Sequence, residues 1–439
     1  MLEKNFKLSA NNTNVKTEFI GGITTFITMS YIIFVNPVIL GSSGMNQDSV
    51  FLATCLSIAF STILMGFCTN YPIALAPAMG HNFYFSFIVC LGMGVSWQTA
   101  LGANFIAAIV FILLSFVGLR EHLVNAIPIS LKSAIVVGIG LLMTVMGLEW
   151  AGIIVSNKGT LIGLGNLKSP IVLFSLFGLT ITSILMALRI RAAILIGILI
   201  NIVAMIFFDF VKFNGIFSKP PSMSATLFKL DIFSACTWEM VGVIFTFFFL
   251  DLFDTVGTLI GVTKKAGIIK NNKLPKAKQA LLSDAISTCV GTVMGTSSVT
   301  AYIESSAGIA SGARTGLANI VTALLFILTI FFYPLVQTIS SGCVIDGVTY
   351  YPVIAPALIL VGNFMLTSVQ DINWKDFTES FPAFLTIVII ALSFSITEGI
   401  VFGFVFYTLL KTCKGKFKEI PPIITIFAFL FILRYIFLK

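Results

Sequence analysis

Long, continuously apolar runs separated by short polar or charged segments dominate the sequence. Residues 49–119 contain no Asp, Glu, Lys or Arg. Because roughly 20 apolar residues cross a bilayer as a helix, this stretch alone predicts about three transmembrane helices. A transmembrane β-barrel would instead show alternating segments of about ten residues. The pattern therefore predicts an all-α polytopic membrane protein.

Breaking the apolar runs at charges, prolines and glycines predicts fourteen transmembrane segments. They lie near residues 19–40, 49–69, 72–93, 97–119, 129–148, 170–188, 191–209, 239–262, 279–295, 296–312, 315–340, 350–369, 380–396 and 398–411. Lys and Arg gather in the loops on the side of the N-terminus, so we expect both termini in the cytoplasm. No cleavage site precedes the first run, and no removable signal peptide is expected. A last apolar stretch, residues 421–438, is expected at the membrane interface or the periphery.

Composition excludes several classes of protein. The chain of 439 residues is 57% hydrophobic and only 10% charged, whereas soluble domains carry about 25% charged residues. The net charge of +8 is divided among short clusters between apolar runs, which argues against a nucleic-acid surface. The seven cysteines show no CxxC spacing, so neither a disulfide framework nor a metal site is expected. Walker A and HExxH motifs are absent, and we expect neither an enzyme nor a cofactor.

The two halves of the chain share one irregular feature. A cut near residue 230 leaves seven predicted segments on each side, and the third segment of each half is unusual. Residues 72–86 read PIALAPAMGHNFYFS, and residues 295–312 read GTSSVTAYIESSAGIASG. Each begins with a Pro-rich or Gly/Ser/Thr-rich piece, which predicts an irregular or β-like start followed by a half-helix. Inverted repeats with a binding site at broken helices are typical of secondary transporters.

Three acidic residues lie inside predicted segments, where each ionisable group costs roughly 2.5 to 3.5 kcal/mol. Asp251 and Asp254 are three residues apart and therefore share one helix face. Glu304 lies where the irregular part of the tenth segment becomes helical. No Lys or Arg lies inside these segments. The acids predict a polar substrate and proton site, or alternatively structural carboxylates that bind backbone exposed at a helix break.

Backbone and neutral side chains add candidate ligands at the two breaks. The amides of Ser305 and Ser306 are expected at the start of a half-helix, where N–H groups lack partners and can donate to a ligand. Asn82 offers both a donor and an acceptor to a heterocyclic edge, or acts as a helix cap. His81 is interpreted as a structural donor in preference to a proton shuttle. Tyr302 is a candidate for stacking on a flat ring.

Four motifs resemble a known family. They are GGITTFITMSYIIFVNP (21–37), APAMGHNFYF (76–85), FLDLFDTVGTLIGV (249–262) and SDAISTCVGTVMGTSSVTAYIESSAGIASGARTGL (283–317). They look like the adenine/guanine/hypoxanthine permeases, the AzgA-type branch of the nucleobase/ascorbate transporter superfamily. The resemblance implies fourteen segments in two inverted seven-span repeats, with short β-strands in the broken third and tenth segments. It implies a core domain (19–119 and 239–340), a gate domain (120–230 and 341–411) and a peripheral C-terminal helix (412–439).

The resemblance also implies roles for single residues. Glu304 matches the principal purine-binding carboxylate, and Asp254 matches the eighth-span acid of the wider superfamily. Asp251 and Asn82 are polar residues characteristic of this branch, and Tyr302 matches a position that lines the pocket. The family usually reads APGMGLNAYF where this chain has Ala78, His81 and Phe83, so fine specificity and proton stoichiometry stay open.

These observations predict a purine transporter of the cell membrane. A purine base is neutral at pH 7, so hydrogen bonds and stacking must recognise it. Desolvation favours the protonated form of a buried carboxylate, and Asp254 or Asp251 is a better candidate proton carrier than Glu304. The same fold carrying uracil, xanthine or an anion is the nearest alternative, and an ion channel or a membrane enzyme is less favoured. The preferred purine, H⁺ or Na⁺ coupling, and homodimer formation are left open.

Overall fold

The chain divides into two structural units. The computed structural model describes residues 2–117, 127–157, 159–268, 274–345 and 347–437. The first unit comprises residues 1–117 and 150–357, and the second comprises residues 118–149 and 358–439.

The first unit holds most of the helices and all the strands that the described residues form. Its elements are α1 (Leu2–Phe6), η1 (Ser9–Asn11), α2 (Val15–Met29), α3 (Ile32–Gly41), α4 (Gln47–Thr69), β1 (Leu75–Pro77), α5 (Met79–Phe83), the π-helical segment η2 (Tyr84–Gly92), α6 (Trp97–Val117), β2 (Ile154–Asn157), β3 (Leu161–Leu164), α9 (Pro170–Ala187), α10 (Ala193–Phe207), α11 (Ile232–Ala235), η3 (Trp238–Met240), α12 (Val241–Lys265), α13 (Ala277–Met294), β4 (Val299–Ala301), α14 (Ser305–Ala310), α15 (Leu317–Thr329), η4 (Ile330–Phe332), α16 (Tyr333–Ser340), β5 (Cys343–Ile345) and β6 (Val348–Tyr350).

The second unit is helical over its described residues. Its elements are α8 (Ile129–Trp150), α17 (Ala355–Leu366), η5 (Thr367–Asp371), α18 (Phe377–Ser393), α19 (Ile396–Cys413), η6 (Phe417–Glu419) and α20 (Pro422–Phe437). The expected gate range included residues 150–230, which here belong to the first unit because α10 contacts α2 and α16. The division into core and gate stays a prediction.

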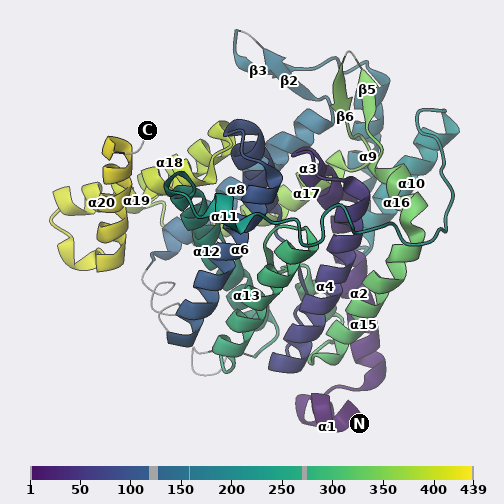
Figure 1. Cartoon of the computed structure of the whole chain (residues 1–439), viewed down its shortest axis with the longest axis horizontal. Helices are drawn as coiled ribbons and strands as arrows, with labels where there is room; N and C mark the ends of the chain where they lie inside the picture. Colours follow the sequence, from purple (N-terminus) through teal and green to yellow (C-terminus); the bar gives the residue numbers. More distant parts are fainter. Residues whose placement is uncertain (1, 118–126, 158, 269–273, 346, 438–439) are drawn as a thin grey trace. The chain divides into compact units, whose positions relative to one another are not determined.

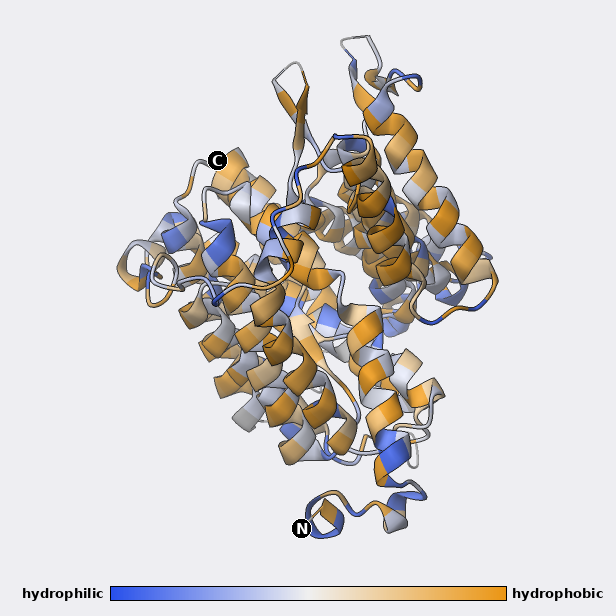
Figure 2. Cartoon of the chain, turned by 90° about the vertical axis from the view of Figure 1, so that its right-hand side faces the viewer, coloured by the Kyte–Doolittle hydropathy of each residue, from blue (hydrophilic) through white to orange (hydrophobic). Residues whose placement is uncertain are grey.

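The chain has the pattern of a membrane protein. Each of the fourteen predicted segments contains at least one helix within the described residues. Figure 2 shows apolar residues along the helices, with many hydrophilic residues at helix ends and connections. Seven described helical segments are long and apolar enough to cross a membrane: Val15–Gly41, Gln47–Thr69, Trp97–Ser115, Ile129–Trp150, Pro170–Ala187, Leu317–Ser340 and Ile396–Cys413. The count of fourteen crossings stays a prediction.

The two irregular segments meet as an antiparallel strand pair inside the first unit. The strands β1 and β4 are completely buried. Two backbone bonds extend the pairing, because the Ala78 amide donates to Ser298 (2.8 Å) and the Tyr302 amide donates to Ala74 (3.0 Å). The half-helices α5 and α14 begin soon after their strands, so both breaks lie at one junction. The register pairs Leu75 with Ala301, Ala76 with Thr300, and Pro77 with Val299.

A matched pair of threonines anchors the two strands. Thr62 of α4 accepts a hydrogen bond from the amide of Leu75 (3.1 Å) and donates to its carbonyl (3.2 Å). Thr288 of α13 does the same for Val299, with both distances 3.1 Å. In each half, the helix before the broken segment thus holds the first residue of the strand. This correspondence supports the internal repeat that the sequence predicts.

One asparagine donates hydrogen bonds to backbone carbonyls around the irregular chain that leads into β1. The side-chain amide of Asn319, on α15, donates to the carbonyls of Thr62 (3.2 Å), Tyr71 (3.0 Å) and Ile73 (2.8 Å). Buried carbonyls without a donor cost free energy, and little water is present at this depth. Asn319 therefore stabilises the third segment from a helix of the other half.

The first segment forms one candidate span over Val15–Gly41, which agrees with the predicted span over residues 19–40. It has a local irregularity, because α2 ends at Met29 and α3 begins at Ile32, while Ser30 and Tyr31 keep helical dihedral angles. The hydroxyl of Ser30 donates to the carbonyl of Ile27 (2.9 Å), a local bond that competes with the helical ladder. Tyr31 lies in the interior of the unit, where it is 1% exposed.

Small residues let α2 approach α14 closely. A Cβ atom at Gly308 would collide with the Thr25 hydroxyl, and one at Gly21 would lie 2.6 Å from Ala313 Cβ. The buried carboxylate of Glu18, also on α2, accepts from the backbone amide of Arg314 (2.8 Å). Close backbone approach through small residues is typical of helices packed within membranes. These contacts fix the tenth segment against the first.

Two β-hairpins project from one end of the first unit (Figure 1). In one, β2 pairs with β3, and in the other, β5 pairs with β6. The N-terminal helix α1 lies at the opposite end of this unit in the same view. Each hairpin lies in a connection between two helices, and neither contributes a residue to the candidate functional site.

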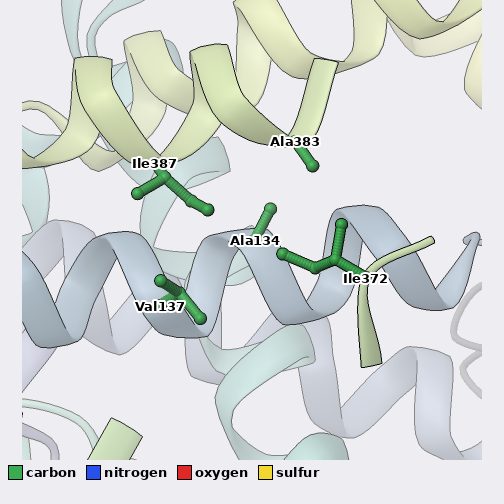
Figure 3. Close-up of a cluster of buried hydrophobic side chains, with 5 residues drawn as sticks. All are labelled: Ala134, Val137, Ile372, Ala383 and Ile387. Carbon is green, nitrogen blue, oxygen red and sulfur yellow. The ribbon is translucent and has the colours of Figure 1, made fainter. Parts of the chain in front are cut away.

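A small apolar core holds the second unit together. Ala134 and Val137 of α8 pack with Ala383 and Ile387 of α18 and with Ile372, as Figure 3 shows. α18 and α19 form an antiparallel pair joined by a short turn.

The C-terminal helix α20 packs against α19. The ring of Phe404 lies 6.2 Å from that of Phe431 and 6.4 Å from that of Phe427. α20 lies within residues 412–439, the segment expected as a peripheral helix. These packing contacts do not require α20 to cross the membrane.

A charged network joins the ends of α18 and α19. Lys411 is only 1% exposed, and its ammonium lies 2.6 Å from Glu419 and 3.1 Å from Glu379. Lys416 lies 2.9 Å from Asp376, the N-cap residue of α18. The hydrogen bond from Lys416, together with the Thr378 amide, holds the pKa of the Asp376 carboxyl well below its usual range. The network therefore favours ionised carboxylates at the end of this helix pair.

We expect Asn319→Leu to destabilise the protein, because three buried carbonyls lose their donor. The free energy of unfolding should fall by about 2 kcal/mol or more. Thermal unfolding of the detergent-purified protein measures the change. The exposed residue Asn166 provides the matched control, since Asn166→Leu should change stability by less than about 0.5 kcal/mol. Equal melting temperatures for the two variants would contradict the assigned role of Asn319.

The Asp376 site predicts a pH-dependent stability. A carboxylate with a lowered pKa stabilises the fold at neutral pH, and this contribution is lost as the pH falls through its folded pKa. Asp376→Asn keeps an N-cap acceptor but removes the charge, so its melting temperature should be lower than that of wild type at pH 7 and converge with it in acid. Asp376→Ala also removes the cap and should cost about 1 kcal/mol more. A constant difference from pH 7 to acid would exclude the ion-pair contribution.

Candidate functional site

The three acidic residues that the sequence singles out all lie in the first unit, around the β1–β4 junction. Asp251 and Asp254 come from α12, and Glu304 comes directly before α14. α12 contacts β4, α14 and α5. The eighth segment and the two broken segments therefore meet at one place, so the three acids can belong to a single site.

Glu304 is held by a tyrosine from the first segment. The hydroxyl of Tyr31 donates to Glu304 Oε1 at 2.8 Å. Tyr31 lies between α2 and α3. Its bond orients the carboxylate. Glu304 itself is only partly buried.

Asp254 forms the more open of the two aspartate sites. Its side chain is 29% exposed, whereas that of Asp251 is 2% exposed. The hydroxyl of Thr300, on β4, donates to Asp254 Oδ2 at 3.3 Å. Asp254 therefore lies beside the strand pair, next to the turn that carries Glu304.

His81 links the two aspartates of α12. Its Nε2 lies 3.0 Å from Asp251 Oδ1, and its Nδ1 lies 3.8 Å from Asp254 Oδ2. His81 is 1% exposed. The imidazole thus occupies the space between a buried carboxylate and a more open one. The sequence analysis interpreted His81 as a structural donor and did not predict that it lies between two aspartates.

Asn82 takes part in a fully buried polar network. Its amide nitrogen donates to Asn36 Oδ1, and its carbonyl oxygen accepts from the hydroxyl of Ser297. Asn36 donates in turn to Thr54 (2.6 Å) and Thr296 (3.1 Å). Both ends of the Asn82 amide are therefore bound by protein groups, which favours a role in positioning the third segment.

The backbone amides of Ser305 and Ser306, which the sequence predicts as donors to a ligand, form hydrogen bonds within the turn before α14. The amide of Ser305 donates to the carbonyl of Tyr302 (3.2 Å), and that of Ser306 donates to Ile303 (2.9 Å). The expectation of unpaired amides was wrong, because residues 302–306 form a tight turn whose own carbonyls accept these bonds. The buried Ser306 hydroxyl has no hydrogen-bond partner among the described residues.

Tyr302 and Ser305 brace the strand pair. The hydroxyl of Tyr302 donates to the carbonyl of Pro77 at 2.6 Å, and the Ser305 hydroxyl accepts from the amide of Ala74 at 3.0 Å. Both bonds cross from the tenth segment to the third. Tyr302 also interacts electrostatically with Glu304 and Asp254. It therefore lies among the site residues, with its hydroxyl already bound.

Sequence reasoning missed Tyr31, Asn36 and Thr300. Tyr31 and Asn36 lie in the motif of residues 21–37, and both are polar positions inside a long apolar run. That pattern was a usable signal, but nothing local shows that Tyr31 contacts Glu304. Thr300 belongs to a strand whose partner is more than 200 residues distant, so its neighbours could not be deduced. The described residues contain no group of three or more His, Cys, Asp and Glu side chains able to hold a metal ion.

The arrangement can bind a neutral, hydrogen-bonding molecule. The partly buried residues Glu304 and Asp254 and the Ser306 hydroxyl lie around one strand junction. Ionised carboxylates accept N–H protons but cannot donate. A ligand with several N–H groups on a compact frame fits this chemistry better than an anion.

Comparison with known proteins identifies relatives along the whole chain. The adenine permease AdeP of Escherichia coli (strain K12) is 46% identical over 439 residues, which cover 100% of this chain and 96% of the relative. The guanine/hypoxanthine permease PbuG of Bacillus subtilis (strain 168) is 45% identical over 449 residues, which cover 99% of each chain.

A solved structure shares the fold. The transmembrane domain of the bicarbonate transporter BicA from a cyanobacterium matches with a TM-score of 0.63 at 14% sequence identity, covering 89% of this chain and 97% of that one.

A family model described as "Permease family" (Xan_ur_permease) matches residues 16–402. This protein is therefore a multi-pass membrane protein that belongs to the permease family and has adenine and guanine/hypoxanthine permeases among its relatives.

Proposed function

We propose that this protein imports purine bases, namely hypoxanthine, guanine or adenine, across the cell membrane by proton symport. The observation that carries the proposal is the Glu304 carboxylate, oriented by Tyr31 at the junction of the two broken segments. The names of the relatives at 45–46% identity support the substrate class.

Recognition of the purine would rest on hydrogen bonds. Purines are neutral at pH 7, so the ring N–H groups are the natural partners of a carboxylate. Glu304 would accept hydrogen bonds from these N–H groups, and Asp254 would bind the base from the α12 side. The Ser306 hydroxyl can serve as either donor or acceptor. Asn82 and Asp251, which are buried in contacts with protein groups, would position the third and eighth segments around the base.

Coupling to protons would use carboxylates that lack a Lys or Arg partner. No ion pair of the described residues joins Asp251, Asp254 or Glu304 to Lys or Arg. A carboxylate without a Lys or Arg partner can bind and release a proton without breaking such an ion pair. Asp254 or Asp251 would bind a proton from outside together with the purine and release it inside.

Alternating access would follow from the repeat. We propose fourteen segments in two inverted seven-span repeats, with a core that moves against a gate and with both termini in the cytoplasm. The matched bonds of Thr62 to Leu75 and of Thr288 to Val299 support two related halves. Binding sites at paired broken helices are a general feature of such carriers.

Uptake into proteoliposomes tests the function itself. We expect an inward proton gradient to drive accumulation of labelled hypoxanthine, guanine or adenine above the external concentration. Uracil and xanthine added as competitors should leave this uptake largely unchanged. Empty liposomes and liposomes with collapsed gradients are the controls. Uptake of uracil, xanthine or an anion without purine uptake would contradict the proposal and support the alternative carriers.

Glu304→Gln should weaken purine binding by about 10- to 100-fold, because a hydrogen bond to a charged group contributes about 1.5–3 kcal/mol. Isothermal titration or scintillation proximity binding measures the affinity. The exposed residue Glu239 supplies a matched control, and Glu239→Gln should bind as wild type does.

Tyr31→Phe removes the bond that orients Glu304 and should weaken binding by a smaller factor than Glu304→Gln. Tyr350→Phe, in the β6 hairpin, is the corresponding control. Unchanged affinity in Glu304→Gln would show that Glu304 does not bind the base.

A further inference from the structure

The His81 imidazole connects two carboxylates of different accessibility. Asp254 is 29% exposed at its side chain, whereas Asp251 and His81 are each 2% exposed. His81 Nε2 and Asp251 Oδ1 lie 3.0 Å apart, and neither atom has a hydrogen-bond partner among the described residues. The two ring nitrogens thus face two different acids, one near the surface of the site and one inside it.

An imidazole in this position has a chemistry that the aspartates lack. Histidine is the side chain whose charge changes closest to neutral pH, and it can accept a proton at one nitrogen while it releases one from the other. The imidazole therefore offers a path for a proton between the two carboxylates.

The surroundings of His81 contain few competing groups. α3, which packs against α5, carries no ionisable side chain. The segment η2 contributes Tyr84 and Cys90. On the far side, Cys289 of α13 interacts with Asp251.

Two further acids lie behind this cluster. Asp284 accepts a hydrogen bond from Thr255 of α12 (2.8 Å), and Glu304 interacts with Asp254. Only Asp251 and Asp254 form ion-pair contacts with the His81 ring among the described residues.

We propose that His81 relays a proton between Asp254 and Asp251. When Asp254 Oδ2 and His81 Nδ1, which are 3.8 Å apart in this structure, approach to hydrogen-bond distance, the O–H bond of protonated Asp254 breaks as an N–H bond forms at Nδ1. The N–H bond at Nε2 then breaks as an O–H bond forms on Asp251. The return step reverses both transfers, so protons balance and no oxidant or reductant is required. Asp251 becomes an internal proton store, reached only through the ring.

The inference rests on the proposed purine–proton symport, and one pair of assays separates the two. Exchange of labelled external purine for unlabelled internal purine requires the carrier to move, but not to release its proton. Uphill accumulation under an inward proton gradient requires proton uptake and release in every cycle. A defect in proton transfer therefore lowers accumulation and spares exchange.

His81→Gln is the informative variant, because glutamine retains a hydrogen-bond donor but cannot pass a proton at neutral pH. We expect it to keep measurable exchange while gradient-driven accumulation falls by about tenfold or more. His81→Leu should show the same split. The other histidine of the sequence, His122, is replaced by Gln as the control for loss of an imidazole, and that variant should accumulate purine as wild type does.

Three results would overturn the relay. In the first, His81→Gln accumulates purine as wild type does. In the second, only His81→Leu is defective, which assigns His81 a hydrogen-bonding role that Gln can fill. In the third, His81→Gln has wild-type thermal stability and has lost exchange together with accumulation, which places His81 in substrate translocation. Absence of purine exchange by wild-type protein would instead reject the proposed function.

Discussion

The pairing of β1 with β4 is the interaction on which the rest of the structure depends. A helix that breaks inside a membrane exposes donors and acceptors that water cannot satisfy there. Here each broken segment uses the strand of the other, and Thr62, Thr288 and Asn319 bind the remaining backbone groups. Because the partners come from opposite halves of the chain, neither half can form its break alone. The strand pair thus joins the repeats and creates an irregular, polar place within an apolar fold.

The candidate site follows from that constraint. The half-helix α14 begins soon after β4, with Glu304 directly before it. Tyr31, between α2 and α3, provides the hydroxyl that orients this carboxylate. α12, an unbroken helix, brings Asp254 and Asp251 to the same junction. Binding and proton chemistry can therefore share one location, as coupled transport requires.

Much of this arrangement could be predicted from the sequence, and the reasons for the remainder are physical. Continuous apolar runs predict membrane helices, and the composition of residues 72–86 and 295–312 predicts the two breaks. The spacing of Asp251 and Asp254 places them on one face. What local patterns cannot show is which distant parts of the chain come together. The Tyr31–Glu304 bond, the Asn36–Asn82 network and the His81 bridge all depend on such contacts. The Ser305 and Ser306 amides were misjudged because a tight turn satisfied them locally.

A structure of the protein with a bound purine would test the central claim most directly. Cryo-electron microscopy of the protein saturated with hypoxanthine, compared with the same preparation without ligand, would locate the base. The account predicts added density between the β1–β4 junction and α12, with a ring nitrogen at hydrogen-bond distance from Glu304. Density for the base elsewhere, with Glu304 out of contact, would contradict it.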